Sequence, residues 1–425
     1  MLNEYAYIQG CNDAPQNLPA VSPAHFKPRG SNQIGLRQYN ERVVLQAIRL
    51  HGAQPKADLA RLTHLSTQTV SLIIDRLIED GLVMRLAPVR GKVGQPSVPI
   101  TLNSDGAFSI GIKIGRRNCD ALLLDFSGQV RERSSLSYDF PDPKKLFAYV
   151  QSQMRALPAK LGAQRAERLV GVGVAAPLSL GGWQALLGVS KQRSEAWSGI
   201  DIQTQLQAMT ALPVRLIKDT SAACVAELVA GRGRSTKSYV YMFIDTFIGG
   251  GMVIDSKLRA GLHGNAGAIG SMALGTIGHA SHDVATRAGA VAQVLSVASL
   301  YQLELLFSQA GLDATACYDD RALEGAYLPH TQRWLKQATA AIAMVVQHTV
   351  CLLDMDAVII DGSLSRSLLA MLRLELDVAL QAYSWEGIEQ PDVQLGMIGA
   401  DARAMGGALL PLYSNFAPDH EVFLK

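Results

Sequence analysis

The residues best suited to recognise another molecule begin at Ser66, where short polar side chains share a segment with an apolar stripe. Ser66 is a preferred N-cap residue, and Gly81 is suited to end the helix that it starts. Short polar side chains on one face of such a helix can hydrogen-bond base edges in the major groove of DNA. The side chains that we expect to face DNA are Ser66, Thr67, Gln68, Thr69, Ser71 and Arg76.

A basic turn punctuated by glycines follows at residues 90–96. The apolar runs at 82–86 and 98–102 flank this turn and predict the two strands of a hairpin. Glycines allow the tip of such a hairpin to approach DNA phosphates or the minor groove closely. The side chains that we expect to make this contact are Arg90, Lys92 and Gln95.

Two further helices are needed to support the reading helix. Apolar residues recur at helical spacing over 36–51, and Gly52 ends that helix. Pro55 suits the first position of a second, short helix over 56–63. Helix, helix, turn, helix and basic hairpin together predict a winged helix-turn-helix over residues 34–103. A helical subdomain whose hairpin binds protein is the alternative interpretation.

Charge is concentrated in the same region. Residues 25–103 hold eleven Lys and Arg and five Asp and Glu, a net charge of +6, whereas all 425 residues carry a net charge of only +2. A compact basic segment beside a nearly neutral body is typical of a nucleic-acid-binding module fused to another unit, although a solvated basic face has the same composition. Residues 1–33 lack periodicity and predict a flexible arm.

Composition excludes several classes of protein. Hydrophobic residues make up 48% of the chain and charged residues 18%, which excludes global disorder. The longest uncharged stretch, 337–353, contains polar residues and predicts a buried helix, not a membrane span. The N-terminus lacks the pattern of a secretory signal, and the five cysteines are scattered without a CxxC motif. We therefore expect a cytoplasmic protein that makes no membrane contact.

The body of the chain, residues 104–425, alternates predicted strands with helical stretches. Two glycine-rich turns, 249–251 and 261–270, follow predicted strands. Alternation of this kind predicts an α/β body, which we expect to have two lobes. The apolar runs that predict strands are 109–114, 121–125, 169–175, 214–217, 239–244 and 357–360.

The chain resembles the ROK family (repressors, open reading frames and sugar kinases) in its transcription-regulator form, from about Leu36 to Leu412. The N-terminal part carries the resemblance in ADLARLTHLSTQTVSLIIDRLIEDGLV. The body carries it in VGVGVAAP, LPVRLIKDTSAACVAEL, YMFIDTFIGGGMVIDSKLRAGLHGNAGAIGSM and LDMDAVIIDGSLS. The resemblance implies an actin-like, hexokinase-like (ribonuclease H-like) body whose two lobes enclose a sugar cleft.

The phosphate-binding residues differ from those of the kinases that the chain resembles. Residues 113–117 (KIGRR) stand where the family's first phosphate loop is similar to D-x-G-G-T, and Phe247 stands where the second loop has glycine. Asp219 keeps the place of the catalytic base, but Lys218 replaces the preceding asparagine. A base without a phosphate loop has no phosphoryl group to transfer. We therefore expect kinase activity to be lost and Asp219 to be vestigial.

The sugar-binding and zinc-binding motifs of the family are altered too. The pattern G-E-(I/L)-G-H becomes GAIGS at 267–271, so Ala268 replaces the sugar-binding glutamate and Ser271 replaces the histidine. No cysteine follows in the zinc segment, which excludes zinc of the family type. We expect no metal and no cofactor, and we interpret His279, His282 and Asp283 as exposed loop residues.

A small-molecule effector, a sugar or a derivative, is still expected in the cleft. Lys218, with Lys113 and Arg116, would favour an acidic or phosphorylated ligand, unless Lys218 pairs with Asp219. An aromatic side chain such as that of Trp197 either stacks on the ligand or belongs to the core. The positions that we expect to meet the effector are Trp197, Lys218, Asp219, Gly250, Asn265, Ala268 and Ser271.

Together these features predict a DNA-binding transcriptional regulator, a repressor of carbohydrate-related genes. It would bind double-stranded operator DNA. The resemblance implies a homodimer or homotetramer, whose two-fold axis would match a pseudo-palindromic site. One alternative is an active sugar kinase with a regulatory DNA-binding arm. The other is a ligand-independent DNA-bound scaffold for a partner protein.

Overall fold

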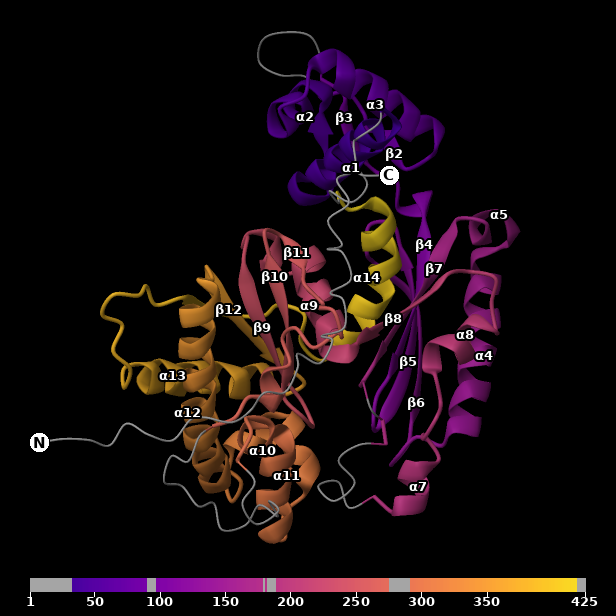
Figure 1. The fold of residues 1–425 in the computed structure, drawn as a ribbon. Coiled ribbons are helices and arrows are strands. Elements are labelled where there is room, and N and C mark those ends of the chain that lie inside the picture. The colour runs from indigo at the N-terminus through magenta and orange to yellow at the C-terminus, as the bar shows by residue number, and fades with distance from the viewer. Residues whose placement is uncertain (1–32, 90–96, 179, 182–188, 275–290, 419–425) are drawn as a thin grey trace, which may run out of the picture.

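An N-terminal unit stands on a two-lobed body in the computed structural model of this chain (Figure 1). The structure describes residues 33–89, 97–178, 180–181, 189–274 and 291–418. Among these residues, no helix is long and apolar enough to cross a membrane. The stretch at 337–353 lies in a long helix, α12 (Leu328–Leu353), one face of which is buried.

The N-terminal unit packs three helices and a small sheet around one apolar core. Ser66 caps the third helix, since its Oγ accepts a hydrogen bond from the backbone N–H of Thr69 at 3.1 Å. The buried apolar stripe of this helix consists of Val70, Ile73, Ile74 and Leu77. Ile78, near the end of the helix, is only half-buried. Gly52 and Gly81 follow helices with positive φ, as their positions predict. The elements are α1 (Gln33–His51), α2 (Lys56–Thr63), α3 (Thr67–Glu79) and a sheet in the order β1 (Gln54–Pro55), β3 (Pro99–Leu102), β2 (Val83–Arg85).

The first lobe is built on a five-stranded sheet with helices on its outer side (Figure 1). Three strands form an antiparallel meander, and two further strands run parallel to its first strand. The sheet order is β6 (Val130–Ser137), β5 (Asn118–Asp125), β4 (Phe108–Ile114), β7 (Leu169–Ala176), β8 (Val214–Lys218), and the helices are α4 (Pro143–Leu161), α5 (Ala163–Ala166), α7 (Lys191–Glu195) and α8 (Ile202–Gln207).

The second lobe repeats this plan, with a meander followed by two parallel strands. The repetition confirms the α/β architecture of two similar lobes. It also makes the β4–β5 turn and the β9–β10 turn structurally equivalent. The sheet order is β11 (Lys257–Leu258), β10 (Gly249–Ile254), β9 (Tyr239–Ile244), β12 (Ala357–Gly362), β13 (Asp392–Leu395), and the other helices are α10 (Leu295–Ala298), α11 (Leu300–Gln309) and α13 (Arg366–Leu380).

Two helices, α9 (Asp219–Ala230) and α14 (Ala402–Phe416), pack between the two sheets (Figure 1). Backbone contact between them requires glycine, because a Cβ on Gly406 would lie 1.6 Å from the carbonyl oxygen of Ala222. A Cβ on Gly173 of β7 would lie 1.9 Å from the carbonyl oxygen of Gly407. As a result, α14 contacts both the first sheet and α9.

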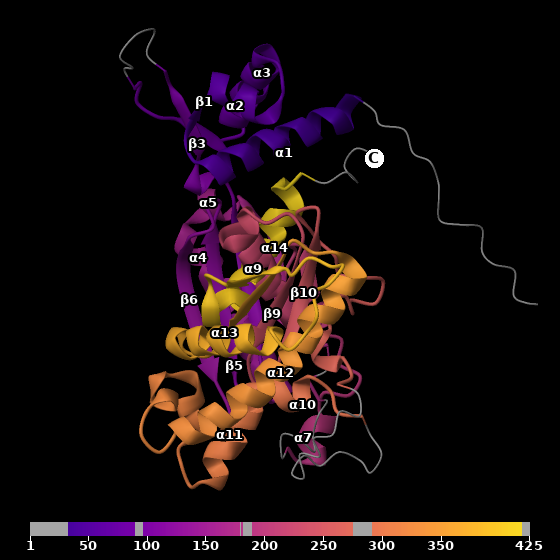
Figure 2. The same cartoon turned by 90° about the vertical axis from the view of Figure 1, so that its left-hand side faces the viewer.

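The far end of α14 meets the N-terminal unit, where α1 crosses above it (Figure 2). Arg42 Nη1 of α1 donates to the carbonyl oxygen of Ala417 at 3.2 Å. Arg234, from the body, donates to the carbonyl oxygen of Leu50 at 2.7 Å. These hydrogen bonds attach the N-terminal unit to the body at the C-terminal end of α14.

Candidate functional site

The N-terminal end of α3 presents polar side chains to solvent. Thr67 and Gln68 are exposed, and the Thr69 hydroxyl lies 2.8 Å from Ser66 Oγ. Leu72, one turn after Gln68, is also 54% exposed. An exposed apolar side chain on this face is suited to contact a thymine methyl group. The pattern of short polar side chains does not mark Leu72, because its side chain is apolar.

Two further positions expected to face DNA have partners on other helices of the N-terminal unit. Lys56 Nζ donates to Ser71 Oγ at 2.9 Å, and Arg76 Nη1 pairs with Glu41 at 3.4 Å. Both contacts draw these side chains toward α1 and α2. Thr67 and Gln68, at the N-terminus of α3, are exposed and, among the described residues, carry no such contact toward α1 or α2.

The tip of the expected wing, with Arg90, Lys92 and Gln95, lies outside the described residues. Its base is present, because Val89 and Ser97 form an antiparallel bridge with N–H to O distances of 2.8 and 3.1 Å.

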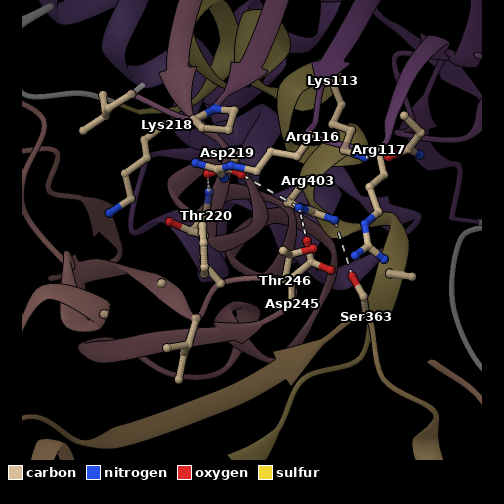
Figure 3. Close-up of a pocket in the computed structure, with 18 of the residues that line it drawn as sticks. Lys113, Arg116, Arg117, Lys218, Asp219, Thr220, Asp245, Thr246, Ser363 and Arg403 are labelled. Carbon is tan, nitrogen blue, oxygen red and sulfur yellow. Dashed lines mark hydrogen bonds and ion pairs between the residues drawn. The ribbon is translucent and has the colours of Figure 1, made fainter. Parts of the chain in front are cut away.

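A cavity of about 700 Å³ lies between the two lobes (Figure 3). This volume falls in the range of small-molecule sites. The β4–β5 turn, the β8–α9 junction, the β9–β10 turn and the start of α14 supply its walls. Of the positions expected to meet an effector, those that line the cavity are Lys218, Asp219, Asn265, Ala268 and Ser271.

Trp197 and Gly250, by contrast, are not among the residues that line this cavity. Trp197 is 7% exposed, and its Nε1 donates to the carbonyl oxygen of Pro141 at 2.9 Å, so it is a core tryptophan. Gly250 lies inside β10, where a Cβ would meet the carbonyl oxygen of Tyr241 at 2.2 Å. Gly250 is thus required for strand packing, and its neighbour Gly249 lines the cavity instead.

Arg403, in the first turn of α14, lies at the centre of the charged floor of the cavity (Figure 3). Its guanidinium pairs with Asp245 and lies 3.8 Å from Asp219 Oδ2. Burial acts to lower the pKa of Arg403, but the two carboxylates outweigh it and raise that pKa. Conversely, Arg403 and Lys113 overcome burial and hold the pKa of Asp245 below its ordinary value. The Asp219 carboxylate is therefore engaged by an arginine.

The two equivalent hairpin turns meet across the cavity. Arg116 of the β4–β5 turn lies over the ring of Phe247 in the β9–β10 turn, with 4.9 Å between Cζ and the ring centroid. Arg117 Nη2 pairs with Glu304 Oε2 of α11 at 2.6 Å. Tyr318 donates its hydroxyl to the other Glu304 oxygen at 2.7 Å. We call the two pairs Arg116–Phe247 and Arg117–Glu304 the interlobe clasp.

The two lysines of the cavity differ in their partners. Lys113 is 4% exposed, hydrogen-bonds Asn118 and lies 3.4 Å from Asp120. Lys218 is half-buried and forms no ion pair or hydrogen bond with any residue that the structure describes. Burial lowers the pKa of both ammonium groups. The expected alternative, a Lys218–Asp219 pair, is not formed.

Three residues that the sequence analysis missed organise this site: Asp245, Glu304 and Arg403. Asp245 had a usable signal, because it directly follows the apolar run at 239–244 and strand ends commonly carry site residues. Glu304 and Arg403 lie within helices, and no motif marks them. Within the described part of the chain, no group of three or more His, Cys, Asp or Glu is placed to hold a metal ion. His279, His282 and Asp283 lie outside that part.

Comparison with known proteins identifies both units. Residues 109–412 match the ROK family, and residues 39–90 match the MarR family. The chain is 24% identical to a xylose repressor of Bacillus spizizenii over 57% of this chain and 62% of that protein. It is 26% identical to the transcriptional regulator Rv0485 of Mycobacterium tuberculosis over 51% of this chain and 49% of that protein. The aligned regions thus span about half to three fifths of these relatives.

Solved structures share the fold. One is a ROK family transcriptional regulator, a homolog of the E. coli MLC protein, with a TM-score of 0.65 and 20% identity over 90% of this chain and 98% of that chain. Another is the ROK hexokinase of Thermus thermophilus, with a TM-score of 0.51 and 20% identity over 71% of this chain and 97% of that chain. Because the family match extends over residues 109–412, well over half of its length, the chain belongs to the ROK family.

Proposed function

We propose that this protein is a transcriptional repressor of carbohydrate-related genes that responds to a sugar or a sugar derivative. The main observation in support of the proposal is that the helix-turn-helix unit packs on the C-terminal end of α14, while the first turn of the same helix lines the interlobe cavity. In this division of labour, residues 34–103 bind DNA and residues 104–425 bind the effector and assemble the oligomer. The xylose repressors among its relatives support the assignment.

DNA recognition is assigned to the N-terminal end of α3. Thr67 and Gln68 are exposed there, and Leu72 extends the same surface. We assign phosphate or minor-groove contacts to the wing residues Arg90, Lys92 and Gln95, which lie beyond the described hairpin base. A homodimer or homotetramer places two such helices on the two halves of an operator.

We assign effector binding, not phosphoryl transfer, to the cleft. The interlobe clasp supports this assignment, since Arg116 and Phe247 pack together where the kinases of the family have small phosphate-loop residues. Asp219, at the position of the catalytic base, lies beside the Arg403 guanidinium.

Coupling between the cleft and the DNA is assigned to α14. Arg403, at one end, pairs with Asp245 of the second lobe, and Phe416 and Ala417, at the other end, contact the body and α1. An effector that changes lobe closure would displace α14 and the unit seated on it. A coupling free energy of about 1–3 kcal/mol is enough to change DNA affinity roughly 5- to 150-fold.

The experiment is a fluorescence anisotropy titration of the full chain against DNA from upstream of its own gene, at two salt concentrations, with scrambled DNA as control. Xylose, other neutral sugars, sugar acids and sugar phosphates are then added separately. We expect salt-dependent, sequence-specific binding that one class of ligand reverses. Equal affinity for upstream and scrambled DNA would contradict the assignment of α3.

The other candidate is an active sugar kinase, because the body shares its fold with a ROK hexokinase. A coupled assay of nucleotide hydrolysis over the same panel of neutral sugars separates the two. Turnover with any of these sugars would overturn the proposed loss of phosphoryl transfer.

A further inference from the structure

Among the residues that the structure describes, those around the cavity carry one more positive charge than their carboxylates balance. Four carboxylates line it, Asp120, Asp219, Asp245 and Asp401, and a fifth, Glu304, pairs with a lining arginine. Against these five stand six cationic side chains, Lys113, Arg116, Arg117, Arg133, Lys218 and Arg403.

The carboxylates are already engaged by residues other than Lys218. Lys113 faces Asp120 at 3.4 Å, and Arg133 Nη2 pairs with Asp401 at 2.8 Å. Glu304 belongs to the interlobe clasp, through Arg117. Asp245 and Asp219 are both engaged by Arg403.

Of the two remaining cations, Arg116 packs over the ring of Phe247. Lys218 is the other, and we assign the unbalanced charge to it. Its side chain is half-buried in the wall of the cavity, and among the described residues it makes no ion pair or hydrogen bond. Figure 3 shows it to one side of the group centred on Arg403 and pointing away from that group. Burial lowers the pKa of Lys218 and outweighs the charge of the neighbouring Asp219, which raises that pKa. A partly desolvated ammonium that forms no ion pair is stabilised when an anion binds beside it.

Neutral hydrogen-bonding side chains complete the same wall. Asn265 and Ser271 line the cavity and are exposed to it, so they offer an amide and a hydroxyl. Such groups are suited to bind the hydroxyl groups of a polyol. A cavity of about 700 Å³ accommodates a ligand that engages both these groups and Lys218.

We propose that the effector of the cleft is anionic: a sugar-sized polyol with one carboxylate or phosphate that pairs with Lys218. This inference rests on the proposed function, because it names the ligand class of the same cleft. Sugar acids and sugar phosphates both carry such an anionic group. A neutral sugar would leave Lys218 without an ion pair.

The test is isothermal titration of the full chain with matched ligands at millimolar concentration. The probes are xylose and xylonate, then glucose, gluconate and glucose 6-phosphate, with inorganic phosphate as the control for a simple ion effect. The proteins are wild type, Lys218→Met, Lys218→Arg, and Lys191→Met as a matched control at an 82% exposed lysine.

We expect at least one sugar anion to bind about tenfold or more tightly than its neutral counterpart, which is the effect of one charged hydrogen bond. Lys218→Met should remove this preference, whereas Lys218→Arg and Lys191→Met should keep it. Gluconate and glucose 6-phosphate distinguish a carboxylate from a phosphate ligand.

Three results would overturn the inference: a neutral sugar that binds as tightly as its acid and its phosphate, an anion whose affinity Lys218→Met leaves unchanged, or no binding by any sugar anion. Anisotropy with operator DNA separates this failure from that of the proposed function. Release of DNA by a neutral sugar alone would overturn the anionic ligand and keep the repressor. Absence of specific DNA binding would overturn the repressor, while the titration still decides the anion site.

Discussion

The Arg117–Glu304 ion pair joins the first lobe to α11 of the second lobe, and Arg117→Gln should weaken the closed arrangement of the cleft. In the wild type, Arg117 Nη2 lies 2.6 Å from Glu304 Oε2. The variant removes the positive charge but keeps a polar side chain. Glu304 then retains the hydroxyl of Tyr318 as a donor, at 2.7 Å.

The exposure of the two side chains sets the size of the effect. Glu304 is 7% exposed and Arg117 is 49% exposed. A fully exposed pair contributes at most about 1 kcal/mol, whereas a buried charged group left without its partner costs about 1–3 kcal/mol. Solvent screening at the half-exposed arginine places the expected cost at about 1–2 kcal/mol. That cost changes the ratio of closed to open forms roughly 5- to 30-fold.

A double-mutant cycle isolates this interaction. The variants are Arg117→Gln, Glu304→Gln and their combination, and the measurements are urea unfolding and hydrogen exchange of the β4–β5 turn and α11. Arg321→Gln is the matched control, because its partners Asp313 and Asp319 lie in the same lobe and are exposed.

We expect faster exchange at both sides of the clasp in each single variant, and little further change in the combination. The control should leave exchange at the clasp unchanged. A coupling free energy near zero, or wild-type exchange rates at the clasp in Arg117→Gln, would refute the reasoning that this pair holds the lobes together.

Three further predictions concern single side chains. Gln68→Ala should cost about 1–3 kcal/mol of discrimination at one base pair, measured by anisotropy on operators with single substitutions, and an unchanged preference would remove Gln68 from the reading surface. Ser66→Ala should lower the free energy of unfolding by about 1 kcal/mol through loss of the cap to Thr69, and Ser66→Asp, which keeps an acceptor, should restore it. Asp245→Asn breaks a buried pair with Arg403 and should cost about 3–5 kcal/mol at neutral pH by chemical denaturation. Since the pKa of Asp245 is held below its ordinary value, its stabilisation is complete above about pH 4 and is lost as the pH falls through the folded-state pKa. The difference between wild type and Asp245→Asn should therefore shrink in acid, and a constant difference would contradict the assigned ion pair.

Local signals in the sequence determined the elements and their order. The Ser66 cap and the positive-φ glycines Gly52 and Gly81 act within one or two turns of their own position, so the boundaries of the three N-terminal helices follow from neighbouring residues. Buried strands such as 239–244 are continuous apolar runs, which can be identified without knowing their partners. The family motifs extended this information to the two-lobed plan of the body.

Tertiary structure alone decided which charges meet in the cleft. Arg117 and Glu304 are separated by 187 positions, and Arg403 reaches Asp245 only because glycines let α14 pack closely between the sheets. The sequence predicted a cationic cleft but left open whether Lys218 pairs with Asp219. The partner of a charged side chain depends on distances between remote segments, and those distances are a property of the packed lobes and not of any local pattern.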